Sequence, residues 1–232
     1  MKKKSKIVIG IIGGLIVGSI TVIAVIFIFI MMLFFGGPPK VTKDVAKYEE
    51  TMQKYMTLEH GSVKTGFFTF PKTVPASAFE QGGQPEFYFW YQDTWDEPTC
   101  ETYLRCAYSE ADYNSEISRL KNISKDYEGQ HHEVIYDDSD RFSHPVYMVI
   151  DHSDMSYEYA MDLGDNTIAY IYTAFKTNRS DLKKIPKEYL PKDYEESLKI
   201  ENGTAFADGN YNIYEFPCDI LGVEAVTYDF SK

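Results

Sequence analysis

The stretch that decides the fold of this chain is residues 157–172, which read YEYAMDLGDNTIAYIY. Large apolar side chains alternate with polar or small ones along its first half: Tyr157, Tyr159, Met161 and Leu163 with Glu158, Ala160 and Asp162. A period of two is typical of a β-strand. Gly164, Asp165 and Asn166 then lead into a second run that is rich in aromatic and β-branched residues. Because these three residue types favour tight turns, we expect an antiparallel hairpin here.

Further strand-like segments flank this hairpin, rich in aromatic and β-branched residues and bounded by Gly, Pro, Asp or Asn. They are residues 63–70, 86–92, 102–108, 133–136, 146–151, 211–216 and 224–230, in addition to the hairpin strands 157–163 and 167–175. Strands outnumber helices, and several are neighbours in the sequence. This order favours an antiparallel sheet over a doubly wound parallel one.

Two amphipathic helices are expected to pack against this sheet. Thr42 can cap the first, whose apolar residues recur at three- and four-residue spacing and which Gly61 can end. Ser109 can cap the second, which runs through Leu120. Prolines break a third helical region, residues 181–199, into short pieces. We therefore predict an α+β domain, a mostly antiparallel sheet with two or three packed helices.

A single transmembrane helix is expected to precede this domain. Residues 7–35 contain no charged side chain, and a helix of that length rises about 43 Å, more than the ~30 Å core of a bilayer. A cleavable signal peptide has a shorter apolar core that ends at small residues. The segment therefore indicates an uncleaved signal anchor in the lipid bilayer, and the alternative is processing near Gly36 or Gly37.

Charge is divided unevenly between the two parts of the chain. The formal net charge is −12, but four of the 23 basic residues lie in residues 1–6, which leaves 19 against 35 acidic residues in the remainder, a net −16. Such an acidic body excludes nucleic acid as a partner. Basic flanks stay cytoplasmic, so we expect a cell-membrane protein with its N-terminus inside and its C-terminal domain outside.

The predicted organisation is thus a basic tail (1–6), a transmembrane helix (7–35), a Gly/Pro linker (36–41) and an extracytoplasmic domain (42–232). Within the helix, Gly10, Gly14 and Gly18 form a small-xxx-small pattern on one face. Such a pattern can bring two helices together as a homodimer. The alternative is that Gly is simply common in membrane helices.

Aromatic residues give the first candidate binding site. All 19 Tyr follow residue 39, and residues 87–91 are continuously aromatic, with Trp95 close behind. Tyr88, Trp90 and Trp95 could stack on a protein, peptide or glycan partner. The alternative is a core strand, because residues 87–91 place aromatic side chains on both faces of a strand.

Histidine and aspartate residues between positions 131 and 154 give the second candidate site. His131, His132, Asp137 and Asp140 could bind a divalent metal, either Zn²⁺ through imidazole or Ca²⁺ through carboxylate. The same region could serve an envelope-associated hydrolase. Because the spacing matches no metal or catalytic motif, polar turns at strand ends are the alternative, and we expect no cofactor.

The three cysteines allow at most one intramolecular disulfide. Cys100 and Cys106 would lie about 20 Å apart on one strand, out of range of each other, so a bridge from Cys218 to one of them is possible, and Cys100 is taken as the candidate. Three buried reduced thiols are the alternative. Taken together, the sequence favours a membrane-anchored, non-enzymatic binding or interaction domain at the cell envelope.

Overall fold

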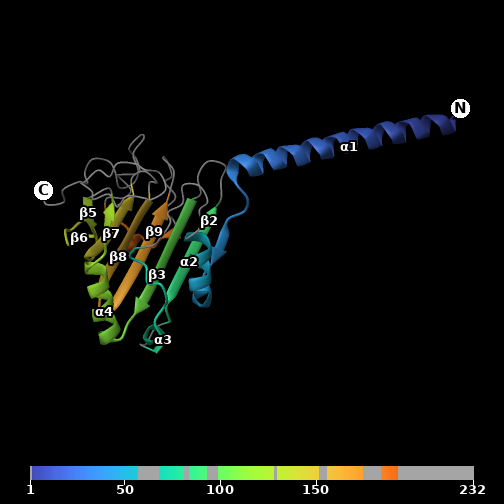
Figure 1. Ribbon diagram of the computed structural model, residues 1–232. Helices are drawn as coiled ribbons and strands as arrows, with labels where there is room; N and C mark the ends of the chain where they lie inside the picture. The colour runs from blue at the N-terminus through green and yellow to red at the C-terminus, as the bar shows by residue number, and fades with distance from the viewer. Residues whose placement is uncertain are drawn as a thin grey trace.

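A computed structural model describes residues 2–56, 68–80, 84–92, 99–127, 130–151, 156–174 and 184–192 of the chain. The described body is one seven-stranded sheet with helices on one side and a short segment on the other. A long N-terminal helix, α1 (Lys2–Phe35), projects away from it (Figure 1). The α+β fold with a mostly antiparallel sheet is therefore confirmed.

The large sheet has the strand order β1-β2-β3-β9-β8-β7-β6, and every neighbouring pair is antiparallel. In chain order its strands are β1 (Lys40–Thr42), β2 (Glu86–Gln92), β3 (Thr99–Ala107), β6 (Ile135–Asp137), β7 (Val146–Asp151), β8 (Ser156–Gly164) and β9 (Thr167–Ala174). A separate hairpin pairs β4 (Ser124–Tyr127) with β5 (Gln130–Glu133). From β3 the chain passes through α4 and this hairpin before it reaches the edge strand β6.

The hairpin predicted at residues 157–172 is confirmed as β8 and β9. Gly164 pairs with Thr167, which leaves Asp165 and Asn166 as a two-residue loop with φ angles of 49° and 56°. Positive φ at both positions belongs to the turn type whose twist matches that of antiparallel strands. A register shift between Asp162 and Gly164 adds a bulge just before the loop.

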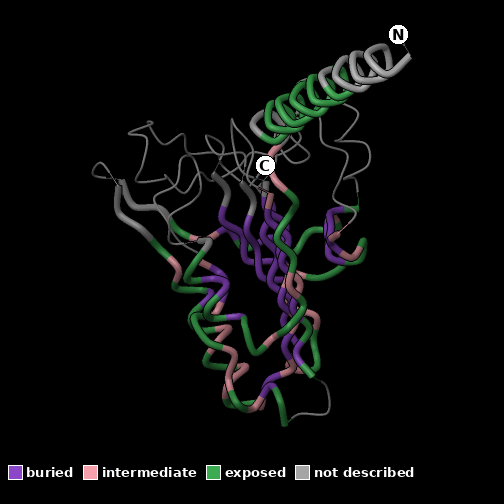
Figure 2. The backbone as a smooth tube through the Cα atoms, turned by 90° about the vertical axis from the view of Figure 1, so that its right-hand side faces the viewer, coloured by how far each residue is buried: buried purple, intermediate pink, exposed green. Residues whose placement is uncertain are grey.

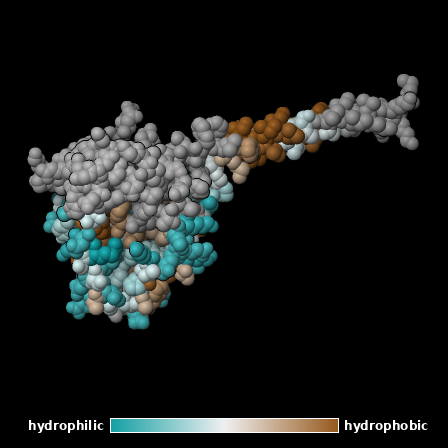
Figure 3. All heavy atoms as spheres, in the orientation of Figure 1, coloured by the Kyte–Doolittle hydropathy of each residue, from teal (hydrophilic) through white to brown (hydrophobic). Residues whose placement is uncertain are grey.

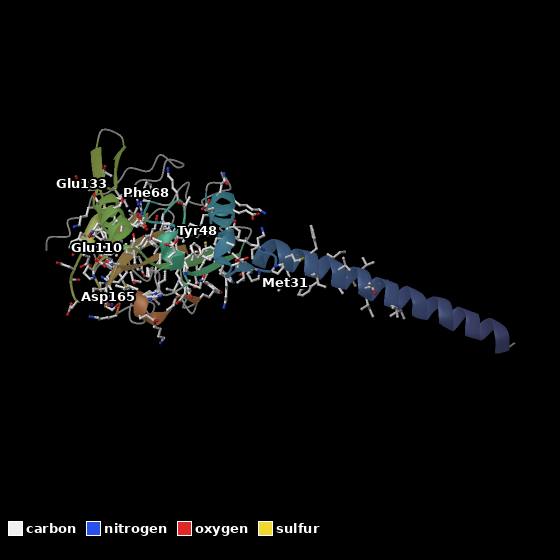
Figure 4. All side chains as sticks on the ribbon, turned by 90° about the horizontal axis from the view of Figure 1, so that it is seen from below. Met31, Tyr48, Phe68, Glu110, Glu133 and Asp165 are labelled. Carbon is white, nitrogen blue, oxygen red and sulfur yellow. The ribbon has the colours of Figure 1, made fainter. Side chains whose placement is uncertain are left out.

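The helices cover one face of the sheet. They are a 3₁₀ turn η1 (Val45–Lys47) continuous with α2 (Tyr48–Met56), the single turn α3 (Ser77–Glu80), and α4 (Glu110–Lys121). Figure 4, viewed along the strands, shows Tyr48, Phe68 and Glu110 on this same side. The core of this side includes Phe87, Leu104 and Tyr170, which are in register across β2, β3 and β9.

The opposite face is covered by residues 184–192, which include the 3₁₀ turn η3 (Lys187–Tyr189). Ile185 and Leu190 pack there against Met148 and Ile171 of the sheet. Burial is accordingly concentrated in the strands, as Figure 2 shows. The sheet is thus covered on both faces, and successive side chains of the central strand β9 are buried from Thr167 to Thr173.

Some details of the sequence prediction are corrected. Residues 68–70, the described end of the predicted strand 63–70, belong to no strand, and the predicted strands 211–216 and 224–230 lie outside the described residues. Thr42 does not cap the first helix, because it pairs with Phe89 in β1, and Asp44 caps η1 instead by accepting a hydrogen bond from Ala46 N. Lys40, which the prediction placed in the linker, is also part of the sheet. The Ser109 cap of α4 is confirmed, since its hydroxyl accepts from Asp112 N.

In α1, the described apolar side chains from Ile16 to Met32 are exposed. Ile16 is 55% exposed and Met32 is 50% exposed. They form the hydrophobic band of the helix in Figure 3, whereas the described surface of the body is mainly hydrophilic. Among the described residues, no helix was found to be both long enough and apolar enough to cross a membrane.

Candidate functional site

A cavity of about 690 Å³ lies on the helix-covered side of the body, between residues 68–75 and α4. Aromatic and apolar groups line it together with hydrogen-bonding ones: Phe68, Phe70, Pro71, Lys72, Thr73, Pro75, Tyr108, Asp112, Ser115, Glu116, Arg119, Asn122, Ile123 and Ser124. This size and mixture are typical of a small-molecule or peptide pocket. The described lining contains neither His nor Cys.

One side of the cavity is formed by residues 68–71, which we call the wall segment and which belong to no helix or strand. Its backbone is held by side chains. The Thr69 and Phe70 N–H groups donate to Glu158 Oε1 at 2.5 and 3.2 Å, and the Thr69 hydroxyl donates to the same oxygen at 2.9 Å. Glu158 is fully buried, so these donors replace the water that its carboxylate would otherwise bind.

Arg119 of α4 holds the same segment by its carbonyl groups. Its Nη1 donates to Phe68 O at 2.9 Å, and its Nη2 donates to Thr69 O. Nε and Nη2 also contact both carboxylate oxygens of Glu116, at 2.8 and 2.6 Å. Burial lowers the pKa of Arg119, but the hydrogen bonds and charge of Glu116 raise it above its usual value, so the guanidinium stays charged.

A chain of hydroxyl groups connects this ion pair to the core of the sheet. Tyr170 donates to Glu116 Oε1 at 2.8 Å, and the Tyr108 and Tyr170 oxygens are 2.6 Å apart. Burial is the main cause that raises the pKa of both tyrosines. Burial also raises the pKa of Cys106, beside Tyr108, to about 12. Both tyrosines are therefore neutral, and the chain joins Tyr170 in the sheet to Tyr108 and Glu116, which line the cavity.

Two further carboxylates attach α4 to its neighbours. Asp112 accepts from the Ser77 hydroxyl of α3. Tyr113 donates to both oxygens of Asp162 on β8, at 2.7 and 2.8 Å. The pKa of Tyr113 is raised by burial and by this hydrogen bond. These contacts fix the position of α4, and hence of the cavity residues that it carries.

The sequence prediction missed the residues that shape this cavity. Glu116 and Arg119 have the i,i+3 spacing of a helical ion pair, which could have signalled that they act together. Glu158 gave no comparable signal, because its position in an alternating strand is equally typical of a solvated carboxylate.

The aromatic candidates on β2 have their ring faces in contact with other parts of the chain. Trp90 is 8% exposed, and Lys184 Nζ lies 3.8 Å from the centroid of its ring. The same ammonium group is 3.0 Å from Glu101 Oε1. Tyr88 stacks on Tyr103 with 5.8 Å between ring centroids.

Three other aromatic residues of this strand, Phe87, Phe89 and Tyr91, are buried, so the core alternative is confirmed for them. Trp95 lies outside the described residues. Ligand binding through Tyr88, Trp90 and Trp95 stays a prediction.

The metal candidates are distributed over two sheets. His131 and His132 belong to β5 in the small hairpin, and their side chains are not among those described. Asp137, at the end of β6, is buried and accepts from Ser139 N at 2.8 Å, and Asp140 is exposed in the following turn. This is the local geometry of the polar-turn alternative. Within the described part of the chain, no three His, Cys, Asp or Glu residues are grouped to hold a metal ion.

The cysteine candidates agree in part with the expectation. Cys100 and Cys106 both lie on β3, are buried, and form no disulfide with another described residue. Cys218 lies outside the described residues, so its predicted bridge to Cys100 stays a prediction. Gly10, Gly14 and Gly18 lie in α1, and a methyl group added at Gly14 or Gly18 would meet no other atom of the chain within 4 Å.

Comparison of the chain with protein-family models, curated proteins and solved structures gave no match.

Proposed function

We propose that this protein is a binding module of the cell envelope, tethered by α1 in the membrane, and that the cavity beside α4 is its binding site. The observation that supports binding is the lining of the cavity. It combines apolar walls with several hydrogen-bonding groups, of which Glu116 and Arg119 are paired with each other, Asp112 accepts from Ser77, and Lys72 adds a positive charge. Such a mixture favours recognition of a polar ligand surface such as a peptide or glycan.

The membrane tether is supported by α1. The helix extends over Lys2–Phe35, its sequence from residue 7 to 35 is uncharged, and its described apolar side chains are exposed to the surroundings. Exposing these side chains to water would be costly, since each is worth about 1.5–3 kcal/mol on burial. Insertion into lipid removes that cost. The cluster of Lys residues at positions 2–6 then favours a cytoplasmic N-terminus.

Protease treatment of intact cells tests the topology. An externally added protease should degrade the body and leave an N-terminal tag on the cytoplasmic side untouched. If the body survives until the cells are lysed, it does not lie outside the membrane.

Site-specific photo-crosslinking in native membranes tests the binding site. A photoreactive residue in place of Ser115, which lines the cavity, should give an adduct of defined mass. The matched control is Ser139, an exposed serine outside the cavity lining. No adduct at Ser115, or the same adduct at both positions, would refute the cavity as the binding site.

Dimerisation through α1 is a separate proposal. Gly14 and Gly18 carry no Cβ and face open space, so a second helix could approach the backbone closely there. The substitution Gly14→Ile should weaken self-association in a membrane reporter assay. Unchanged self-association would show that the glycine face is not the dimer contact.

A further inference from the structure

We propose that Glu158 and Arg119 are positioning residues of the cavity, which set its shape by holding the backbone of the wall segment in place. On this view the cavity opens when either contact is lost, while the sheet beneath it stays folded. The inference rests on the proposed function only in taking the cavity as the binding site.

The first argument is how the backbone groups of the wall segment are satisfied. Buried peptide groups need partners, and in most segments these are other peptide groups. In the wall segment, side chains supply several of these partners. Glu158 accepts from two N–H groups, Arg119 donates to two carbonyl groups, and the Tyr48 hydroxyl donates to Pro71 O at 2.6 Å.

The second argument is that the two charged side chains come from different elements and contact the same residue. Thr69 donates its N–H to Glu158, which rises from β8, and accepts at its carbonyl from Arg119, which comes from α4. The two contacts join positions 89 and 50 residues apart in the sequence. Because the donors and acceptors are fixed on separate elements, the wall segment is held only while the sheet and α4 keep their spacing.

The third argument is electrostatic. A fully buried carboxylate such as that of Glu158 is costly unless it is well hydrogen-bonded, and three of its bonds come from the wall segment alone. Hydrogen bonds to charged groups are the strongest kind, and losing one changes a local equilibrium about ten- to hundredfold. Glu158 therefore holds the wall segment more strongly than a neutral side chain of the same size would.

The experiment measures amide hydrogen exchange on the full chain in detergent micelles. Glu158→Gln keeps the shape and one acceptor oxygen but removes the charge. We expect exchange of the Thr69 and Phe70 amides to rise at least tenfold, with the amides of β3 and β9 exchanging as in the unchanged protein. Glu110→Gln, an exposed glutamate in the first turn of α4, is the matched control and should change neither set.

Arg119→Lys provides the second variant, because Arg119 is 39% exposed in its side chain and its replacement leaves the charge in place. Lysine cannot form the forked contact, so exchange at Thr69 and Phe70 should again rise at least tenfold. If Glu158→Gln does not fold, this variant alone decides.

The proposal is overturned if exchange at the two amides changes less than twofold. It is also overturned if it rises equally in the wall segment and the sheet, because that result means general destabilisation. Either outcome leaves the crosslinking test at Ser115 intact, so failure of the positioning role and failure of the binding site are distinguishable.

Discussion

Tyr170→Phe tests whether the hydroxyl chain beneath the cavity stabilises the fold. The substitution removes one oxygen from a fully buried ring and leaves the packing of that ring unchanged. Two contacts are lost: the bond donated to Glu116 and the 2.6 Å contact with Tyr108. A hydrogen bond to a charged group contributes about 1.5–3 kcal/mol and a neutral one about 0.5–1.5 kcal/mol. Glu116 keeps its two contacts with Arg119, so we expect a loss of about 2–3 kcal/mol, at the lower end of their sum.

The assay is urea unfolding of the full chain in micelles, followed by near-ultraviolet circular dichroism. A loss of that size is a large part of the ~5–15 kcal/mol that stabilises a typical domain. The control is Tyr136→Phe, since Tyr136 is 52% exposed on the edge strand β6 and should change the unfolding free energy by less than about 0.5 kcal/mol. If the two variants unfold alike, the hydroxyl chain contributes nothing measurable and the reasoning is wrong.

Three further predictions concern the turn, the thiols and alkaline pH. Asn166→Val should destabilise the body by about 1–2 kcal/mol in the same unfolding assay, because a β-branched residue resists the positive φ there, whereas Asn166→Gly should be nearly neutral. Cys100 and Cys106 should resist alkylation at pH 8 until urea is added, since burial raises the pKa of both thiols; mass mapping would detect early labelling, which would contradict their burial. Burial raises the pKa of Tyr147 to about 12, so the folded state disfavours its ionised form. The neutral Tyr147 hydroxyl therefore makes its full contribution to the free energy of unfolding below pH ~10, and this contribution is lost as the pH rises towards 12. Unfolding free energies that stay constant from pH 9 to 11.5 would contradict this shift.

Much of the sheet could be predicted from local sequence. Strands β2 and β7 have the predicted bounds, and the hairpin loop lies at Asp165 and Asn166 as expected. These features depend on neighbouring residues alone: β-branched and aromatic runs, the alternation of side chains, and residues that tolerate positive φ. The cap at Ser109 was predictable for the same reason, because its hydroxyl bonds a backbone group three residues away.

The candidate cavity was not predictable in this way. The alternation of Glu158 with Tyr157 and Tyr159 is typical of a strand with one polar, solvated face. In the structure that face is covered by the wall segment, and Glu158 is buried. Its partner Thr69 lies 89 residues earlier in the chain, and no local pattern records such a contact.

The sequence by itself therefore determined where β2, β7 and the turn between β8 and β9 lie, and that an uncharged stretch at residues 7–35 follows a basic start. These features follow from side chains within a few positions of one another, whereas the β4–β5 hairpin had no such local signal. Only the tertiary structure decided that the sheet is covered on both faces, and that Glu158 and Arg119 meet at Thr69. The reason is physical. A carboxylate can lie in the interior only when donors reach it, and the donors here come from a segment that folding alone brings to the sheet.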